Sequence, residues 1–203
     1  MVNTVNSRPD TPGKQDLRSR VLAERATTSP AQRDSEAAEL ALHIVGLVTP
    51  GSTVCAYMPV GREPGSPAML DALRDHGAHV LLPIARDPGP LSWATYEGPD
   101  TLIRAPYGLL EPAGPAQPPE AIGTAAVVLL PALAVDRRGV RLGRGAGFYD
   151  RTLDLAAPGA RLVAVVRDSE FFDELPEDPH DRRVNWALTP GRGPVRLGAT
   201  PAE

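Results

Sequence analysis

The residues of this sequence that are best suited to chemistry lie together in the segment 139–150. Glycines at positions 143, 145 and 147 alternate there with other residues, and two arginines, Arg141 and Arg144, lie beside them. Alternating glycines let the backbone approach a ligand closely, and successive backbone N–H groups can form a pocket for an anion. Guanidinium groups add fixed positive charge for phosphate oxygens. The segment therefore predicts a phosphate-binding turn; the alternative is a tight connection between a strand and a helix.

The position of this segment in the chain favours ligand binding. It follows the most apolar run, residues 126–135, and precedes a helix predicted to begin at Phe148. Ligands of α/β proteins bind at the carboxyl ends of parallel strands, and the start of a helix adds a positive dipole end. The segment lacks the Gly-Lys-Ser/Thr of a P-loop and the spacing of the dinucleotide fingerprint.

Charged residues elsewhere could complete such a site. Asp150 could hold Mg²⁺ beside a nucleotide, because Mg²⁺ prefers one or two carboxylates together with phosphate oxygens; alternatively, it is an ordinary carboxylate in the first turn of a helix. Lys14 and Arg18 lie one helical turn apart and can reach the same anion, or they form a solvated face. Lys14 is the only lysine among 21 basic residues, which indicates either a need for a compact ammonium or codon bias.

Three other residues have side chains that could take part in chemistry. Glu63 follows a predicted strand in a Gly/Pro-containing loop, where it either binds a polar substrate group or is an ordinary surface glutamate. Asp181 either joins the site or pairs with a neighbouring arginine in an exposed loop. Cys55 lies in an apolar strand, where a buried thiol is typically inert. The sequence offers no Ser/His/Asp or Cys/His arrangement with an assignable role, which argues against a hydrolase that uses a covalent nucleophile.

Composition limits the classes of protein to which the chain can belong. It has 203 residues, of which 42% are hydrophobic and 23% charged, so we expect one globular domain over residues 13–200 and a disordered tail over residues 1–12. The formal net charge of −4 argues against nucleic-acid binding. No run is long and apolar enough to cross a membrane, and the N-terminus does not resemble a signal peptide. We expect a cytoplasmic monomer that acts on a small molecule.

Hydrophobic periodicity and turn residues predict the elements that must position these side chains. The expected helices span about 14–26, 30–48, 67–76 and 148–156, and the expected strands span 53–58, 79–84, 91–96, 162–166 and 184–188, with a Pro/Gly-rich loop over 99–119 and a glycine turn over 139–147. The apolar run 126–135, which Pro131 interrupts, is expected to form a central strand followed by an extended arm. Strands that alternate with helices build a parallel sheet covered on both faces. The predicted fold class is therefore α/β, a three-layer sandwich with a mostly parallel central sheet flanked by helices.

Taken in order, these segments resemble the 5-formyltetrahydrofolate cyclo-ligases, also called methenyltetrahydrofolate synthetases. The resemblance runs from Lys14 to about Thr189, and its most specific part is Arg141-Leu142-Gly143-Arg144-Gly145-Ala146-Gly147-Phe148-Tyr149-Asp150. Less specific parts are Lys14-Gln15-Asp16-Leu17-Arg18, Tyr57-Met58-Pro59 with Glu63, Tyr107-Gly108-Leu109-Leu110-Glu111-Pro112, and His180-Asp181.

The resemblance implies an ATP- and Mg²⁺-dependent conversion of 5-formyltetrahydrofolate to 5,10-methenyltetrahydrofolate through a phosphorylated formyl group. It implies that Lys14 and Arg144 stabilise the transferring phosphoryl group and that Asp150 and Asp181 accompany the magnesium ion. The implied ATP-binding residues are Lys14, Gln15, Asp16, Leu17, Arg18, Arg141, Leu142, Gly143, Arg144, Gly145, Ala146, Gly147, Phe148 and Tyr149. The implied folate-binding residues are Met58, Glu63, Arg144, Gly145, Ala146, Gly147 and Phe148.

The sequence departs from the usual family pattern at several positions. Phe148 stands where a tyrosine is common, and Ala146 stands where glycine or lysine is common. The residues after Glu63 also differ from the usual apolar residue and threonine. Two alternatives therefore stay open: a non-catalytic paralogue that binds nucleotide or folate, and a related ligase that acts on another small substrate.

Overall fold

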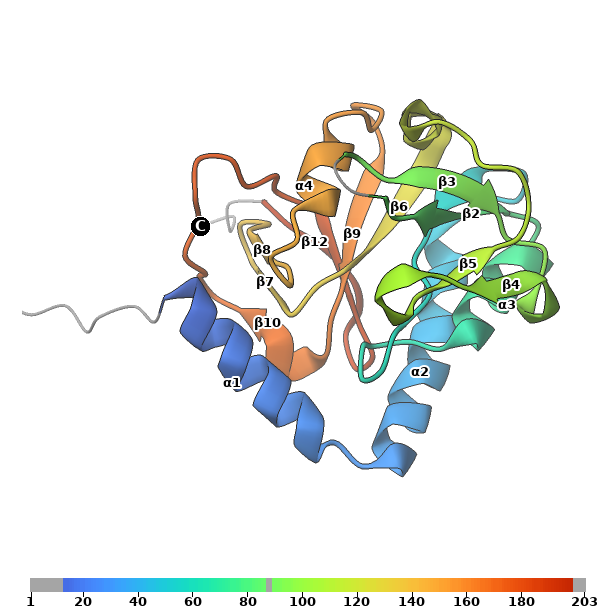
Figure 1. The fold of residues 1–203 in the computed structure, drawn as a ribbon. Coiled ribbons are helices and arrows are strands. Elements are labelled where there is room, and N and C mark those ends of the chain that lie inside the picture. The colour runs from blue at the N-terminus through green and yellow to red at the C-terminus, as the bar shows by residue number, and fades with distance from the viewer. Residues whose placement is uncertain (1–12, 87–88, 199–203) are drawn as a thin grey trace, which may run out of the picture.

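The structure, a computed structural model that describes residues 13–86 and 89–198, is built around a seven-stranded sheet with the order β12-β11-β9-β6-β1-β2-β3 (Figure 1). The strands from β11 to β2 run parallel, and the edge strands β3 and β12 are antiparallel to their neighbours. The bounds are β1 (Thr53–Cys55), β2 (His79–Ile84), β3 (Ser92–Thr95), β6 (Ala125–Pro131), β9 (Arg161–Val165), β11 (Trp186–Thr189) and β12 (Gly193–Arg196).

The parallel strands are apolar because both of their faces are buried. Val54 of β1 and Leu129 of β6 point into one hydrophobic cluster, while Cys55 and Leu130, their neighbours in the chain, point into the other. Side chains alternate between the two faces of a strand, so a sheet covered on both sides needs apolar residues at nearly every position. In the sequence, these strands are therefore continuous apolar runs and do not alternate between apolar and polar residues.

One face of the sheet is covered by α2 (Pro30–Ile44), the short 3₁₀-helix η1 (Val45–Leu47) and α3 (Pro67–Asp75). The Ser29 hydroxyl accepts a hydrogen bond from the backbone N–H of Gln32 at 3.2 Å, so α2 begins where the Ser-Pro pair predicts. The apolar stripes of the two long helices pack on the sheet through Leu40, Ile44, Met69, Leu70 and Leu73.

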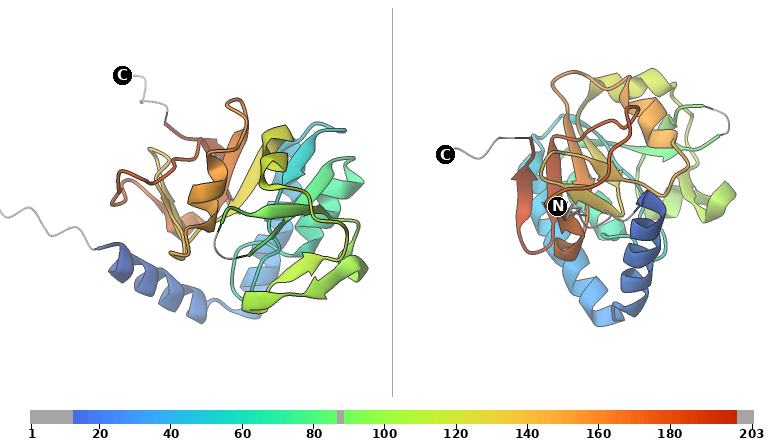
Figure 2. Two further views of the ribbon diagram at one scale, coloured as in Figure 1. Left: turned by 45° about the horizontal axis from the view of Figure 1, so that its top comes forward. Right: turned by 90° about the vertical axis from the view of Figure 1, so that its left-hand side faces the viewer.

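The opposite face is covered by α4 (Phe148–Leu153) and the 3₁₀-helix η4 (Pro119–Thr124), which contribute the buried Leu153 and Ile122 (Figure 2). The sheet thus lies between two helical layers, as the sequence predicts. Helix α1 (Lys14–Thr27) packs elsewhere, on a small sheet of β7 (Ala134–Asp136), β8 (Arg141–Leu142) and β10 (Phe171–Phe172). The side chains that α1 buries there are Leu17 and Val21.

The prediction of a continuous loop over residues 99–119 was wrong. This segment contains a two-stranded antiparallel sheet of β4 (Leu102–Arg104) and β5 (Leu110–Pro112), with 3₁₀ turns at η2 (Pro99–Thr101) and η3 (Pro106–Gly108). Prolines are tolerated in strands at edges and ends, so the high proline content concealed two strands of three residues each.

Several observed helices and strands also begin or end at other residues than predicted. The expected strand 53–58 ends at Cys55, and the expected glycine turn 139–147 contains β8. The run 126–135 divides at Pro131 into β6 and β7, in agreement with the expected central strand and extended arm. The helix that begins at Phe148 ends at Leu153 rather than near 156. Strands β10 and β12 and the 3₁₀-helix η5 (Asp168–Glu170) were not predicted. Short strands are fixed by the partner with which they pair, and a partner distant in sequence leaves no local signal.

Two expectations concern the chain as a whole. The tail over residues 1–12 and the end of the expected domain at 199–200 lie outside the described residues. Within the ranges that the structure describes, no helix is both long enough and apolar enough to span a bilayer.

Replacing Leu40, which is fully buried on α2, with alanine tests the packing of this helix on the sheet. We expect Leu40→Ala to lower the free energy of unfolding by about 2–5 kcal/mol, because the substitution removes apolar contacts and leaves a cavity. Leu42 on the same helix is 69% exposed, and Leu42→Ala is expected to change the stability by less than about 0.5 kcal/mol. Urea unfolding of both variants measures the difference, and equal losses would contradict the described orientation of α2.

Candidate active site

A cleft of about 590 Å³ opens at the carboxyl edge of the parallel strands. Its walls include Tyr57 and Met58 after β1, Pro83 and Ala85 around the end of β2, and residues 131–133 after β6. From β1 the chain proceeds to β2, whereas from β6 it proceeds to β9 on the other side of the sheet. The two connections thus leave in opposite directions, and this switch point is where open α/β sheets bind their ligands.

The glycine-rich turn forms one wall of the cleft, between β8 and α4. Gly145 and Gly147 have φ angles of +99° and +71°, which favour glycine over residues with a side chain. A Cβ at Gly147 would meet only the guanidinium of Arg151, the far end of an exposed and flexible side chain, so it is the φ angle and not a lack of space that favours glycine there. The Nε of Arg18 on α1 donates to the carbonyl oxygen of Gly143 at 3.0 Å. Helix α1 therefore holds the turn from the side.

Arg141 places a buried positive charge in the same wall. Its Nη2 donates to the Asp150 carboxylate at 2.7 Å, and its guanidinium carbon lies 5.8 Å from the centre of the Tyr149 ring. The Nε of Arg141 is buried and has no hydrogen-bond partner within the described part of the chain. Buried polar groups are normally satisfied, so the unpaired Nε of Arg141 is a donor that a further acceptor could use.

Glu63 and Arg144 form an ion pair across the cleft. The Arg144 Nε lies 3.1 Å from the Glu63 carboxylate, which also accepts the backbone N–H of Val60 at 3.0 Å. Glu63 is 10% exposed and Arg144 is 55% exposed. A half-exposed ion pair contributes little to stability, so the guanidinium can exchange one anionic partner for another. The pair thus brings Glu63, which is predicted to bind folate, into contact with Arg144, which is predicted to bind phosphate.

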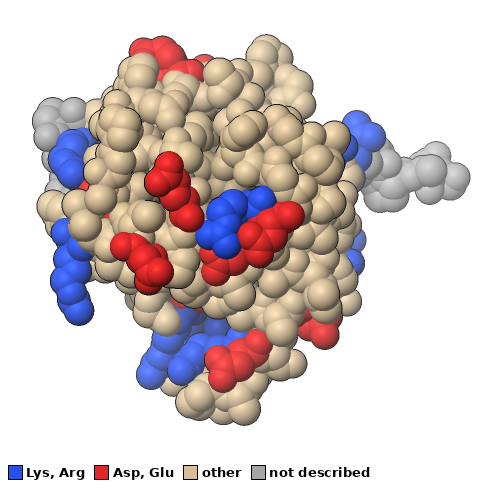
Figure 3. All heavy atoms as spheres, turned by 90° about the vertical axis from the view of Figure 1, so that its right-hand side faces the viewer, with Lys and Arg blue, Asp and Glu red and all other residues tan. Residues whose placement is uncertain are grey.

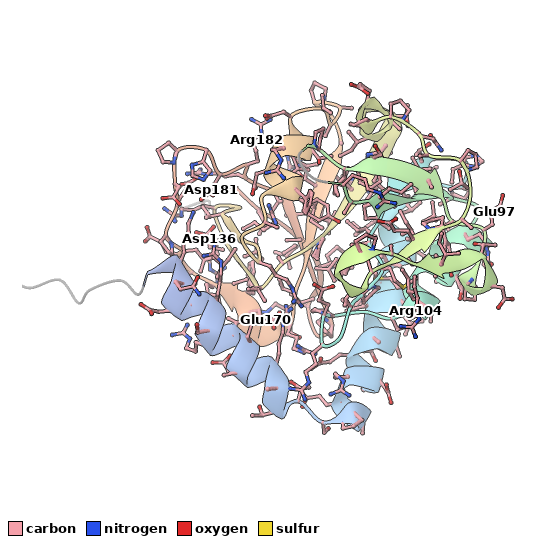
Figure 4. All side chains as sticks on the ribbon, viewed as in Figure 1. Glu97, Arg104, Asp136, Glu170, Asp181 and Arg182 are labelled. Atoms are coloured by element: carbon pink, nitrogen blue, oxygen red, sulfur yellow. The ribbon has the colours of Figure 1, made fainter. Side chains whose placement is uncertain are left out.

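Lys14 lies at the start of α1, where its ammonium donates to Asp178 at 2.6 Å and to Asp181. Figure 4 shows Asp181 above this end of the helix. Partial burial acts to lower the pKa of Lys14, but the hydrogen bonds and charges of Asp178 and Asp181 outweigh it, so the pKa is raised above its usual 10.5. The hydrogen bond from Lys14 also lowers the pKa of the Asp178 carboxyl. Lys14 is therefore a cation, and its charge is shared by two carboxylates.

These features match a known family. The model of the 5-formyltetrahydrofolate cyclo-ligase family matches residues 10–190. The chain belongs to this family. It is 53% identical over 189 residues to the 5-formyltetrahydrofolate cyclo-ligase of Mycolicibacterium smegmatis, an alignment that covers 91% of this chain and 97% of the relative. It is 26% identical over 143 residues to the Escherichia coli protein of the same name, covering 69% and 79% of the two chains.

Solved structures agree with the family assignment. The NMR structure of Aquifex aeolicus 5,10-methenyltetrahydrofolate synthetase superposes with a TM-score of 0.72 and 25% identity, covering 94% of this chain and 95% of that one. The synthetase from Mycoplasma pneumoniae, at 18% identity, shares the fold with a TM-score of 0.68, covering 87% of this chain and 98% of that one. Membership of the family makes this protein an enzyme, a ligase.

The structure brings most of the predicted site residues of this cyclo-ligase family member to the cleft. Those that line it are Met58, Glu63, Arg141, Gly143, Arg144, Gly145, Ala146, Gly147, Phe148, Tyr149 and Asp150. Arg18 contacts the turn, and Lys14 and Asp181 contact each other at the start of α1. Asp150 and Asp181 thus pair with different cations. Leu17 and Leu142 are buried in the cluster under α1, while Gln15 and Asp16 are exposed.

Two polar residues that line the cleft, Arg25 and Tyr57, had no role predicted from the sequence. Arg25 lines the cleft from α1 and is 3% exposed, and its signal in the sequence was its position on the same helical face as Lys14 and Arg18. Tyr57 lines the cleft and donates its hydroxyl to the Pro64 carbonyl oxygen at 2.7 Å. Burial, reinforced by the charge of Glu63, raises the pKa of Tyr57 well above its usual value, so the hydroxyl stays protonated.

Cys55, the only cysteine, is fully buried, and burial raises the pKa of its thiol to about 12. The thiolate is the reactive form, so we expect the native protein at about pH 8 to react with iodoacetamide at least ~100-fold more slowly than the protein in urea. Mass spectrometry of the single labelled site measures both rates. Equal rates would show that Cys55 is accessible and would contradict the prediction that it is inert.

Proposed function

We propose that the enzyme converts 5-formyltetrahydrofolate to 5,10-methenyltetrahydrofolate, with conversion of ATP to ADP and phosphate and a requirement for Mg²⁺. The observation that carries the proposal is the meeting of Glu63 with Arg144 in one cleft. Arg144 belongs to a turn of glycines and arginines suited to phosphate, and Glu63 lies among apolar residues suited to a flat ring. A volume of about 590 Å³ is in the usual range for a small-molecule site.

Nucleotide binding is supported by the glycine turn. The left-handed conformations at Gly145 and Gly147 leave the backbone bare of side chains, so backbone N–H groups can approach phosphate oxygens. Arg18, which donates to Gly143, and Arg144 bring positive charge to the first part of the turn. We propose that ATP is held by residues of the helix start and of the turn: Lys14, Gln15, Asp16, Leu17, Arg18, Arg141, Leu142, Gly143, Arg144, Gly145, Ala146, Gly147, Phe148 and Tyr149.

Magnesium binding is supported by the oxygen ligands that the site offers. Asp150 lines the cleft directly after the glycine turn, and its carboxylate is a hard ligand of the kind that Mg²⁺ prefers. Asp178, His180 and Asp181 form a second group, with potential ligand atoms within 4.8 Å of one another. We propose Asp150 and Asp181 as the magnesium-associated carboxylates. Each is paired with a cation, Arg141 or Lys14, that is also proposed to bind phosphate.

Folate binding is supported by the apolar end of the cleft. Met58, Leu91, Leu109 and Leu110 give it an apolar lining that excludes water and suits an aromatic ring. Glu63 is the acidic group in this lining, and its carboxylate can accept hydrogen bonds from pterin N–H groups. The proposed folate contacts are Met58, Glu63, Arg144, Gly145, Ala146, Gly147 and Phe148.

The chemistry follows from the poor leaving group in the substrate. ATP supplies a phosphoryl group to the formyl oxygen and leaves as ADP. N10 then bonds to the formyl carbon and gives up its proton, the carbon–oxygen bond breaks, and phosphate leaves and takes up that proton. Such a transfer needs positioning and charge neutralisation more than a protein nucleophile. Lys14 and Arg144 supply that neutralisation in the proposal, and the apolar wall shields the reacting atoms from water.

An absorbance assay tests the proposed reaction. With purified protein, we expect the methenyl-folate band to rise only when ATP, Mg²⁺ and 5-formyltetrahydrofolate are all present, with one ADP formed per methenyl product. Binding of both ligands without turnover would overturn the proposal in favour of the non-catalytic alternative. ADP release that requires a different substrate from a panel would favour the related ligase.

Alanine substitutions of Lys14 and Asp178 separate a phosphate role of Lys14 from a structural one. We expect Lys14→Ala to lower turnover by at least ~100-fold, because a positioned cation on the transferring group is lost. Asp178→Ala removes a partner of the same ion pair and is expected to change turnover by less than about threefold. Initial rates at saturating substrates measure both. Similar losses in the two variants would assign Lys14 to the ion pair alone.

A further inference from the structure

A cluster of four charged side chains lies beside the cleft; Arg25, Arg167 and Glu170 are buried, and Glu36 is half-buried. Arg25 of α1 forms a bidentate ion pair with Glu170 of η5, in which its Nε lies 2.7 Å from one carboxylate oxygen and its Nη2 lies 2.8 Å from the other. Arg167 contacts the same carboxylate through its backbone N–H at 2.9 Å and reaches Glu36 of α2 through its Nε at 2.6 Å. In Figure 4, Glu170 lies beside α1.

The cluster is balanced in charge and withdrawn from solvent. Two arginines face two glutamates, and the side chains of Arg25 and Glu170 are 3% and 2% exposed. A buried charge is tolerated only when it is paired and hydrogen-bonded, and both oxygens of Glu170 accept hydrogen bonds here. Unlike the ion pair of Glu63 with Arg144, this contact is not open to exchange with a ligand.

The cluster connects parts of the cleft that are far apart in sequence. The Nη2 of Arg25 also donates to the carbonyl oxygen of Ala132, in the cleft wall that follows β6, at 2.6 Å. Arg167 donates to the carbonyl oxygen of Arg62, next to Glu63 in the chain, at 3.4 Å. Helix α1, the end of β6 and the loop that carries Glu63 are therefore joined through one set of charges.

Helix α1 does not pack on the central sheet, so the small sheet and the polar contacts of Lys14, Arg18 and Arg25 hold it in place, and those of Arg25 are the most deeply buried. Leu17 and Val21 attach it to the small sheet through apolar contacts, which do not fix rotation or sliding closely. Arg25 is the residue of α1, as far as the structure describes it, that lines the cleft, and its three hydrogen bonds have defined directions. Lys14 and Arg18 project from the same face of the helix, three and two turns earlier.

We propose that Arg25, held by Glu170, is a positioning residue for the nucleotide half of the cleft. The pair sets the rotation and the axial position of α1, so that Arg18 reaches the glycine turn and Lys14 reaches Asp178 and Asp181 in the geometry that binds phosphate. This inference rests on the proposed function, because it uses the phosphate roles of Lys14 and Arg18.

Arg25→Lys and Glu170→Gln isolate the positioning role. The lysine keeps the charge but lacks the planar fork that contacts two oxygens and a carbonyl at once, so α1 loses its directional attachment. The glutamine keeps the shape of Glu170 but loses its charge. Leu73→Ala is the matched control, because it opens a cavity under α3 on the distant helical layer and destabilises the protein without touching the cleft.

The experiment is calorimetric titration of each folded variant with a non-hydrolysable ATP analogue and Mg²⁺, accompanied by steady-state kinetics. For Arg25→Lys and Glu170→Gln we expect Kd for the analogue and KM for ATP to rise at least ~10-fold, while kcat at saturating ATP falls less than about threefold. Leu73→Ala is expected to leave Kd and KM within about twofold of wild type despite a lower unfolding temperature. Amide exchange is expected to accelerate in α1 of Arg25→Lys more than in α2.

The outcomes separate this inference from the proposed function. If the wild-type protein binds the analogue and both cluster variants bind it equally well, the positioning role is overturned and the proposed function stands. If kcat falls in Arg25→Lys while KM for ATP stays constant, the cluster acts on something other than nucleotide binding, and the inference is also overturned. If the wild-type protein does not bind the analogue, the proposed function itself fails.

Discussion

The central sheet is buried on both faces, and this burial restricts where the molecule can place its charged chemistry. Charged groups within the faces would lose their hydration, so the parallel strands carry apolar side chains such as Val54 and Leu130 almost throughout. Polar residues can cluster only where the strands end. At the carboxyl edge, the connections from β1 and β6 leave in opposite directions and open a cleft. The glycine turn, Glu63 and Arg141 all occupy that edge.

The charges around the cleft are of two kinds. The first pairs an exposed or half-exposed group with a partner that a ligand could replace, as in the contact of Arg144 with Glu63. The second is fully buried and fixed, as in the contact of Arg25 with Glu170. On the face of the molecule shown in Figure 3, basic and acidic side chains lie next to one another amid mostly uncharged surface. An ion pair whose partner can be exchanged is suited to binding a ligand. A buried ion pair is suited to holding in place the helices and loops that carry the binding residues.

Local signals in the sequence predicted the elements whose stability is local. The Ser-Pro pair before Gln32 predicted the start of α2, because the cap and the fixed proline φ act within one turn. The central parallel strands were predicted because their burial requires long apolar runs. Strands β4, β5, β8 and β10 were missed, since each is only two or three residues long and exists because a partner strand satisfies its backbone.

For the site, the sequence by itself determined the glycine turn and its arginines, because a bare backbone and fixed charges are properties of neighbouring residues. It also placed Lys14 and Arg18 together, since four residues make about one helical turn. Only the tertiary structure decided that Lys14 meets Asp181, that Glu63 meets Arg144, and that the Arg25 contact with Glu170 supports α1. These partners lie far apart along the chain. The crossover connections of the sheet bring them together, and residue types alone do not specify where those connections lead.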